Sequence, residues 1–228
     1  KFESQLIFFV IFIAEEEHGL WVKARCGHDE YPGFVEKNLL TETFNQATHV
    51  VADARAHIYK DASIKSAMIT TLSLGSLIHV VEQGEKFAKL ENGTYIYSKH
   101  IVPVGAPGTD HVAAALKFLE TPYQWGGRSG FGIDCSGLVQ VALAFCGVAA
   151  PRDTDQQIIA IGQPVSDTST LKHGDIVFFP GHVGIMTDDK NILHANAFHM
   201  KTVVEPLSDV VARSSKNDGK GITAARRI

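Results

Sequence analysis

The sequence has 228 residues, of which 45% are hydrophobic and 20% charged, a composition typical of a globular protein of one to three domains and not of a disordered chain. A formal net charge of −4 disfavours a nucleic-acid-binding face, and three cysteines are too few for a disulfide framework. No run reaches the roughly 18 apolar residues of a membrane-spanning helix.

The first stretch with a clear pattern is the apolar run LIFFVIFIA at residues 6–14. Its β-branched and aromatic residues predict a pair of buried strands, although its length also matches the apolar core of a signal peptide. The run follows Glu3 and lacks a small-residue cleavage site, and the sequence does not begin with Met. We therefore expect the chain to start inside a longer protein.

Residues 1–104 consist of short apolar runs broken by Gly, Asn, Asp and Pro, which is typical of small all-β units. They carry a faint internal repeat, in which an apolar strand, an acidic turn and a Lys-bearing strand recur. The matching segments are 12–24 with 79–90, and 33–40 with 94–101. Both copies resemble bacterial SH3-type barrels, and we predict the first at 1–44 and the second at 45–104.

The first copy departs from the SH3-type pattern near its start. A Gly-Glu turn normally follows a segment such as QLIF, but here Phe9 follows directly after Phe8. Because a hairpin needs a turn at that place, we predict a break or an unusually tight loop at Phe8–Phe9 and an incomplete first barrel. Residues 41–49 and the Pro/Gly-rich residues 103–110 are interpreted as linkers.

From residue 111 the pattern becomes helical and then strand-like. Three helices are predicted: 111–120 with Asp110 as N-cap, 135–147 with Gly147 as C-cap, and a third within 151–162 with Asp153 or Thr154 as N-cap. From Asp175 onward the segments DIVFF, HVGIMT, NILHANA and KTVVEP predict strands. Helices followed by a meander of strands predict an α+β domain over residues 105–228.

Cys135 stands at the start of the second predicted helix, in the segment FGIDCSGLVQ. The first-turn N–H groups of a helix have no intrahelical partner, and the helix dipole adds about half a positive charge at that end. Both effects favour the thiolate, which is the nucleophilic form of cysteine. Cys26 and Cys146 are instead interpreted as small buried core residues.

Two histidines, His182 and His194, stand on consecutive predicted strands that are joined by a turn at 188–191. Antiparallel pairing places both side chains on one sheet face, so His182 could accept the cysteine proton while His194 fixes the tautomer of His182. A zinc site built from Cys135 and the two histidines is the alternative that uses the same side chains. His173 and His199 are interpreted as surface or hydrogen-bonded core residues.

Four motifs occur in the order TPYQWGG, DCSGLVQ, GDIVFFPGHVGI and ILHAN. Over about residues 110–228 they resemble the NlpC/P60 family of papain-like cysteine peptidases. Two SH3-type barrels ahead of such a domain are similar to the γ-D-glutamyl-L-diamino acid peptidases of that family (dipeptidyl-peptidase VI type), which cut bacterial cell-wall stem peptides after L-Ala-γ-D-Glu. The resemblance implies a papain-like fold, a murein peptide as substrate, and no metal or organic cofactor.

The same resemblance implies the catalytic residues. Cys135 would be the nucleophile, His182 the base and His194 the third group, which orients His182. The hydroxyl of Tyr123 would lie near the developing oxyanion, with the backbone N–H of Cys135 as a further donor.

The substrate pocket is also implied by the resemblance. Asp134 would bind the free amine of L-Ala, and Ser136 together with Thr154 would hold the D-Glu carboxylate. From its position before the second predicted helix, Asp134 is alternatively the N-cap of that helix, a role that does not exclude amine binding. An acid suits an ammonium group and hydroxyls suit a carboxylate. Arg152 and Asp153 are expected to form a local ion pair that shapes this pocket.

We therefore expect hydrolysis of the γ-D-Glu–L-diamino acid bond, through a cysteine thioester, in peptides with a free N-terminal L-Ala. The alternatives are an endopeptidase on intact peptidoglycan, a cell-wall binding protein with a weakly active catalytic domain, and an amidase or acyltransferase with a broader apolar groove. No nucleic-acid partner and no membrane insertion are expected. A requirement for a free amine favours recycled fragments in the bacterial cytoplasm, and export stays open.

Overall fold

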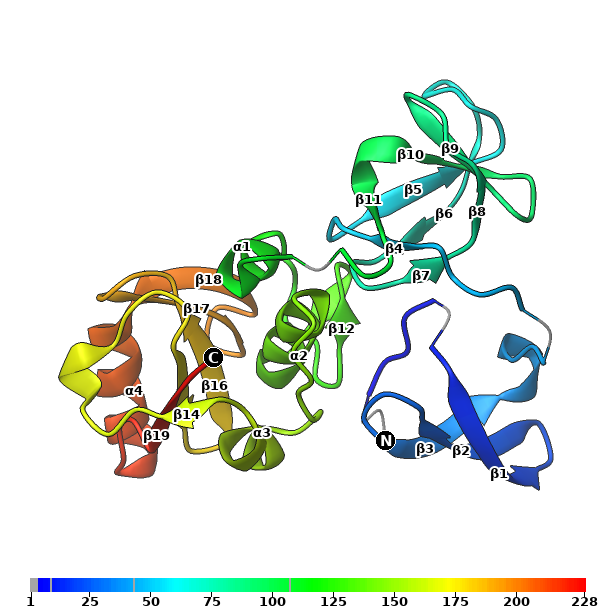
Figure 1. Ribbon diagram of the computed structural model, residues 1–228. Helices are drawn as coiled ribbons and strands as arrows, with labels where there is room; N and C mark the ends of the chain where they lie inside the picture. The colour runs from blue at the N-terminus through cyan, green and yellow to red at the C-terminus, as the bar shows by residue number, and fades with distance from the viewer. Residues whose placement is uncertain (1–3, 9, 43, 107) are drawn as a thin grey trace. The chain divides into compact units, whose positions relative to one another are not determined.

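The computed structural model describes residues 4–8, 10–42, 44–106 and 108–228. Contacts divide the chain into two compact units: residues 6–106 form one unit, and residues 107–228 with the first five residues form the other. Figure 1 shows the all-β unit in blue to green and the α+β unit in green to red. The predicted division of the N-terminal part into domains 1–44 and 45–104 stays a prediction.

The all-β unit contains three small antiparallel sheets. The first has the order β1-β2-β3, the second β6-β5-β10-β9-β8, and the third β11-β4-β7. The strands are β1 Phe12–His18, β2 Trp21–Cys26, β3 Pro32–Glu36, β4 His49–Val51, β5 Ala56–Tyr59, β6 Met68–Leu72, β7 Leu77–Ile78, β8 Val80–Glu82, β9 Phe87–Leu90, β10 Tyr95–Tyr97 and β11 Ile101–Pro103.

The internal repeat of the sequence reappears in these sheets. Each copy forms two hairpin-linked strands and a third antiparallel strand, β1-β2-β3 in one and β8-β9-β10 in the other, and each ends in a 3₁₀ turn, at Lys37–Leu39 and Ser98–His100. In the second copy, buried and partly exposed residues alternate along β9, so that Ala88 and Leu90 face the hydrophobic core. The shared pattern therefore encodes a shared local structure.

The apolar run at residues 6–14 does not form a pair of buried strands, so that prediction is wrong for the described residues. Strand β1 begins only at Phe12, and the side chains of Leu6, Phe8, Ile11 and Ile13 are exposed. Phe8 lies in a turn and its carbonyl accepts a hydrogen bond from the amide of Leu77, at 3.3 Å. The predicted break at Phe8–Phe9 falls partly on Phe9, which lies outside the described residues.

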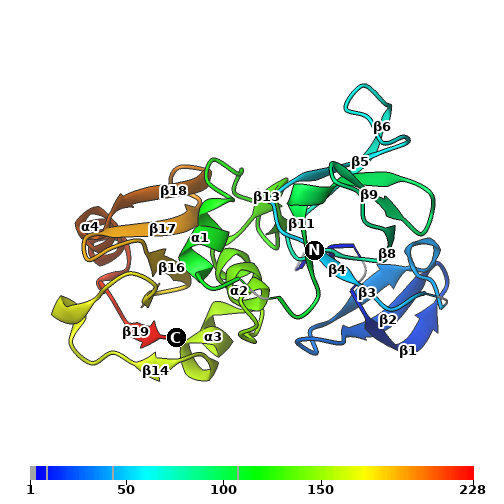
Figure 2. The same ribbon diagram turned by 45° about the horizontal axis from the view of Figure 1, so that its top comes forward.

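The α+β unit is built on one antiparallel sheet of order β14-β19-β15-β16-β17-β18. The views in Figure 1 and Figure 2 both show the sheet between helix α2 on one side and helix α4 on the other. Its elements are α1 His111–Leu116, β12 Arg128–Ser129, β13 Gly132–Ile133, α2 Cys135–Phe145, α3 Thr154–Ala160, β14 Gln163–Pro164, β15 Ile176–Phe179, β16 His182–Met186, β17 Asn191–Asn196, β18 Lys201–Pro206, α4 Leu207–Asp218 and β19 Ala224–Arg227.

Most of the predicted elements of this unit are confirmed, together with two of the caps. The side chain of Asp110 accepts a hydrogen bond from Val112 N, and that of Asp134 accepts one from Gly137 N. Helix α4 and strand β19 were not predicted. These segments contribute few buried apolar residues to the core, Val210 and Ala225 among them, so their sequences show no clear apolar periodicity. Cys146 is half-buried and not a core residue, so that interpretation is wrong, whereas Cys26 is buried.

Candidate active site

Cys135 is the first residue of α2, and this end of the helix packs closely against the backbone at Gly127. Asp134 caps the helix, its Oδ1 accepting the Gly137 amide at 2.7 Å. A Cβ on Gly137 would lie 2.4 Å from the carbonyl oxygen of Gly127, so only glycine allows this approach. The close packing leaves Cys135 with 8% of its surface exposed.

Three hydrogen-bond donors surround the Cys135 sulfur, and they come from three different elements. They are the backbone amides of Ser136 on α2 and Val183 on β16 and the side chain of Thr154 on α3, and all of them lower the thiol pKa. Burial raises that pKa by more, the charge of Asp134 adds to the rise, and the result is about 11. The amide at the helix start favours the thiolate, as expected from the sequence, but burial outweighs it and the thiol stays protonated.

Asp134 lies at the centre of a buried polar network. Arg152 donates from Nη2 to Asp134 Oδ2 at 2.6 Å and from Nη1 to Ser136 Oγ at 2.8 Å, and the amide of Gly126 also donates to Oδ2, at 2.8 Å. The expected ion pair of Arg152 with Asp153 is thus replaced by a pair with Asp134. Arg152 is only 2% exposed, so the two charges neutralise each other away from water.

Tyr123 belongs to the same cluster by its electrostatics. Burial raises its pKa to about 12, with further contributions from the charges of Cys135 and Asp134 and an opposing one from Arg152. The phenol is therefore a neutral hydrogen-bond donor at physiological pH. Thus Tyr123, Asp134, Ser136 and Thr154 are all gathered around Cys135, as the sequence predicts.

The two histidines meet on the neighbouring strands β16 and β17, as predicted. The strands are antiparallel, with Ile185 opposite Leu193, and the side chain of Asp188 caps the turn between them. His182 Nε2 lies 2.7 Å from His194 Nδ1. Gly184 lets the side chains of β17 lie close to β16, since a Cβ there would lie 2.7 Å from Ile192 Cδ1 and 3.1 Å from the Cβ of His194.

Both rings are neutral in this environment. Burial lowers the pKa of His182 to about 3, with a further decrease from the adjacent His194, and burial also lowers the pKa of His194. The ring of His182 makes no hydrogen bond to the Cys135 sulfur in the described structure; the nearest link is the amide of Val183, the next residue along β16.

Glu205 and Arg213 complete the histidine side of the site, and the sequence interpretation missed both. Glu205 Oε1 lies 2.8 Å from His194 Nε2, and Arg213 binds both carboxylate oxygens. Although burial raises the pKa of Glu205, hydrogen bonds from Arg213 and His194 lower it to about 2. For Glu205, the only signal in the sequence was an acidic residue on the same face of the predicted strand as apolar Val203. For Arg213 there was no signal, because it lies on the unpredicted α4.

A cavity of about 180 Å³ opens on the α4 side of the histidine pair. Its wall includes His182, His194, Phe198 and Arg213, and the Arg213 guanidinium stacks 4.4 Å from the centre of the Phe198 ring. His199, interpreted from the sequence as a surface or core residue, reaches within 3.4 Å of Glu205. Polar, aromatic and aliphatic groups therefore line this cavity beside the pair.

A zinc site built from Cys135, His182 and His194 does not fit these distances. The facing ring nitrogens of the histidines are 2.7 Å apart and hydrogen-bonded to each other, which leaves no space for an ion between them.

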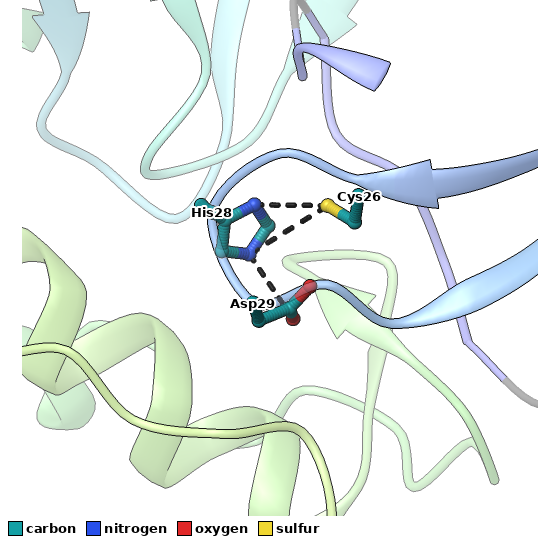
Figure 3. Close-up of side chains that lie close together, drawn as sticks. All are labelled: Cys26, His28 and Asp29. Atoms are coloured by element: carbon teal, nitrogen blue, oxygen red, sulfur yellow. Dashed lines mark hydrogen bonds and ion pairs between the residues drawn. The ribbon is translucent and has the colours of Figure 1, made fainter. Parts of the chain in front are cut away.

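Cys26, His28 and Asp29 form the other group of metal-binding side-chain types among the described residues (Figure 3). The sulfur lies 2.9 Å from His28 Nδ1, whereas the Asp29 carboxylate lies 3.2 Å from Nε2 on the opposite side of the ring. The sulfur also lies 4.0 Å from Nε2, so one ligand atom from each of the three residues lies within 4.8 Å of the others, a spacing that fits a metal ion as well as a chain of hydrogen bonds.

No helix in the part of the chain that the structure describes is both long enough and apolar enough to cross a membrane.

Comparisons with known proteins bear on this geometry. The sequence profile of the NlpC/P60 family matches residues 120–215. The chain is 32% identical to dipeptidyl-peptidase 6 of Lysinibacillus sphaericus, over 81% of this chain and 76% of that protein. It is 28% identical to the γ-D-glutamyl-L-lysine dipeptidyl-peptidase of Bacillus subtilis (strain 168), over 85% of this chain and 72% of that protein.

A solved structure shares the fold. A crystal structure of an NlpC/P60 family protein from Bacillus cereus ATCC 10987 matches with a TM-score of 0.81 at 24% sequence identity, over 99% of this chain and 81% of that one. The prediction of a papain-like α+β catalytic part is thereby confirmed. The antiparallel sheets of the N-terminal part agree with a β-rich region, and their SH3 character stays a prediction.

Proposed function

This chain belongs to the NlpC/P60 family and is a cysteine peptidase, and we propose that it hydrolyses the γ-D-Glu–L-diamino acid bond of bacterial cell-wall stem peptides. The observation that carries the proposal is a buried thiol at a helix start, ringed by donors from three elements, on a chain whose relatives are named dipeptidyl-peptidases. The name of the Bacillus subtilis relative gives the γ-D-glutamyl-L-lysine linkage.

In the proposed reaction Cys135 attacks the γ-carbonyl carbon of D-Glu. Its proton passes to His182, which then donates it to the departing amine of the diamino acid. A thioester remains, and water deprotonated by His182 hydrolyses it. Because the resting thiol and imidazole are both neutral, proton transfer accompanies attack and does not precede it.

The negative charge that develops on the carbonyl oxygen needs fixed donors. We assign the Tyr123 hydroxyl and the Cys135 backbone N–H to this role. The raised pKa of Tyr123 keeps its proton in place throughout the reaction. Removing one donor from comparable oxyanion holes costs about 2.7–4 kcal/mol of transition-state stabilisation.

Ser136 and Thr154 are proposed to hold the α-carboxylate of D-Glu, since both stand at helix starts. The Thr154 side chain also hydrogen-bonds to the Cys135 sulfur, and Ser136 Oγ lies 2.8 Å from the Arg152 guanidinium. Asp134 is proposed to bind the amine of L-Ala. Its two oxygens already accept from Arg152 and from two backbone amides, so the ammonium would share this carboxylate and not capture it alone. A requirement for a free amine also agrees with relatives that are named dipeptidyl-peptidases.

The N-terminal unit is proposed to contain two SH3-type barrels that contact the peptide or the cell wall. The repeated arrangement of two hairpin strands, a third strand and a 3₁₀ turn supports a common ancestor for its two halves. Short peptides with a free amine arise when cell-wall fragments are recycled, which favours a cytoplasmic location in a bacterium.

The test compares L-Ala-γ-D-Glu-L-Lys, its diaminopimelate analogue and the N-acetylated form of each, with products identified by mass spectrometry. We expect release of the diamino acid from the free peptides. We also expect kcat/KM to be about ten- to hundredfold lower after acetylation, as for the loss of a charge-assisted contact of roughly 1.5–3 kcal/mol. Equal rates on free and acetylated peptides would indicate an endopeptidase for the intact wall, and no cleavage would refute the substrate class.

A further inference from the structure

The histidine pair has two possible proton arrangements, and the described contacts select one of them. His194 faces His182 through Nδ1 and faces Glu205 through Nε2, at 2.7 and 2.8 Å. A neutral imidazole carries one proton, so one of these nitrogens donates and the other accepts. Which nitrogen carries the proton decides what His182 can do.

Glu205 requires the proton to be on Nε2. Arg213 binds both oxygens of Glu205, so the carboxylate is ionised and can only accept hydrogen bonds. A bare Nε2 lone pair at 2.8 Å from this charge would be strongly repelled. His194 therefore donates from Nε2, and its Nδ1 accepts a proton from Nε2 of His182.

Asn196 offers a competing contact that must be weighed. Its amide nitrogen lies 3.0 Å from His194 Nε2, and its oxygen accepts from the His199 amide at 2.7 Å, which fixes the orientation of the amide. A donor at Nε2 would favour the opposite tautomer of His194. The carboxylate outweighs it, because the repulsion involves a full charge that lies closer to the ring than a neutral amide.

We propose that Glu205, held by Arg213, is a positioning residue that keeps the His194 proton on Nε2 and thereby leaves Nδ1 of His182 free to accept the proton of Cys135. This inference rests on the proposed catalytic roles of Cys135 and His182. It assigns a residue, a ring nitrogen and a direction of proton transfer that the triad assignment alone leaves open.

The charges around the pair give Glu205 a second effect. Among the described residues, three titratable or charged groups face Glu205: His194 from β17, Arg213 from α4 and His199 from the loop before β18. Asp218 is a further charged residue that lines the cavity beside the histidine pair. When His182 accepts the proton it becomes cationic, and Arg213 opposes this charge while Glu205 favours it. Removing the carboxylate leaves Arg213 unbalanced and weakens the base.

The first experiment uses the full chain with the variants Glu205→Gln, Glu205→Asp and, as a matched control, Glu120→Gln, whose carboxylate pairs with Lys201 on the surface of the same unit. We expect Glu205→Gln to lower kcat at least about tenfold while KM stays nearly unchanged. The loss should be smaller than the roughly 10⁴-fold loss that a wrong histidine tautomer causes in a serine protease triad. Its acid limb in the pH profile should move to lower pH. Glu205→Asp should recover part of the rate, and Glu120→Gln should match the wild type.

The second experiment reads the tautomer without using catalysis. In Cys135→Ala protein, ¹⁵N–¹H correlation spectra of histidine rings should show His194 protonated on Nε2, and adding Glu205→Gln should give a mixture of tautomers. If Glu205→Gln fails to fold, the double variant Glu205→Gln/Arg213→Gln removes both buried charges. It should restore folding but neither the rate nor the single tautomer.

The outcomes separate this inference from the proposed function. A Glu205→Gln variant with wild-type kcat and an unmoved acid limb, or a wild-type His194 protonated on Nδ1, would overturn the role of Glu205 while Cys135→Ala remains inactive. Activity that survives in Cys135→Ala would instead refute the proposed nucleophile.

Discussion

Two cysteines of this protein each lie near a histidine and a carboxylate, but the two clusters are assembled in different ways. Cys26, His28 and Asp29 occupy one hairpin turn and form a chain through both ring nitrogens (Figure 3). Cys135 and the pair of His182 with His194 instead stand on a helix and two strands, and the linked carboxylate of Glu205 stands on a third strand. Nearness in sequence produces the first cluster, whereas the fold produces the second.

The difference lies in what each sulfur can do. Cys26 is 2% exposed, and its sulfur hydrogen-bonds to the ring of His28 in the same turn, whose backbone also bonds Cys26, so the cluster stabilises that turn. The Cys135 sulfur is surrounded by amide and hydroxyl donors that point at it from three elements. Convergent donors from separate elements, and not the residue types alone, are the reason for proposing Cys135 as the nucleophile.

The largest expected effect is on catalysis. Cys135→Ala should lower the hydrolysis rate by about 10⁴-fold or more, because the proposed mechanism forms the thioester on this sulfur. Its matched control, Cys26→Ala, should retain wild-type kcat on the same tripeptide. Circular dichroism of both variants should be unchanged, and substantial turnover by Cys135→Ala would remove the distinction between the two sulfurs.

The next effect is on stability. Arg152→Met removes the partner of buried Asp134 and should reduce the free energy of unfolding by about 3–5 kcal/mol, measured by urea denaturation. Glu120→Gln breaks an exposed pair and should change it by less than about 1 kcal/mol. A small effect of Arg152→Met would mean that the network around Asp134 contributes little to the fold.

A third effect concerns pH. The pKa of His182 is lowered by burial to about 3 in the folded protein, while an unfolded histidine titrates near 6.5. The unfolded state therefore binds more protons between these values, so the contribution of this one ring to stability should fall by about 1.4 kcal/mol per pH unit as the pH decreases well below 6.5. His182→Gln should show a shallower slope, and identical slopes would mean that this ring is accessible to solvent.

The smallest effect is expected in the hairpin cluster. Asp29→Ala removes the carboxylate oxygen that accepts the Tyr31 amide at 3.2 Å, and should lower the free energy of unfolding by about 1 kcal/mol. Hydrolysis should not change. A loss of kcat comparable with that of Cys135→Ala would instead show that the cluster of Cys26, His28 and Asp29 takes part in catalysis.

Sequence patterns located the parts of the site that depend on local structure. Asp134 as a cap, Cys135 at a helix start and two histidines on paired strands follow from periodicity and turn chemistry, and the structure contains all of them. Two results depended on tertiary packing and could not be read from the sequence. Burial reverses the expected shift of the Cys135 pKa, and Arg152 pairs with Asp134 instead of its sequence neighbour.

The same limit applies to the elements. Helix α4 places Arg213 against Glu205, but its low apolar content gave no clear helical pattern. The run at residues 6–14 gave the opposite error. Its apolar residues predict buried strands, but strand β1 begins only at Phe12, and Leu6, Phe8, Ile11 and Ile13 are exposed. Periodicity reports local preference, and burial is decided by what the rest of the chain brings alongside.

The assignment of Cys135 is tested most directly by acid-quenching the enzyme during turnover of L-Ala-γ-D-Glu-L-Lys and mapping the trapped acyl group by mass spectrometry. The proposed mechanism predicts an L-Ala-γ-D-Glu adduct on the peptide that contains Cys135, and none in Cys135→Ala protein. Product that accumulates without an adduct on this residue, or an adduct on Cys26 or Cys146, would contradict it.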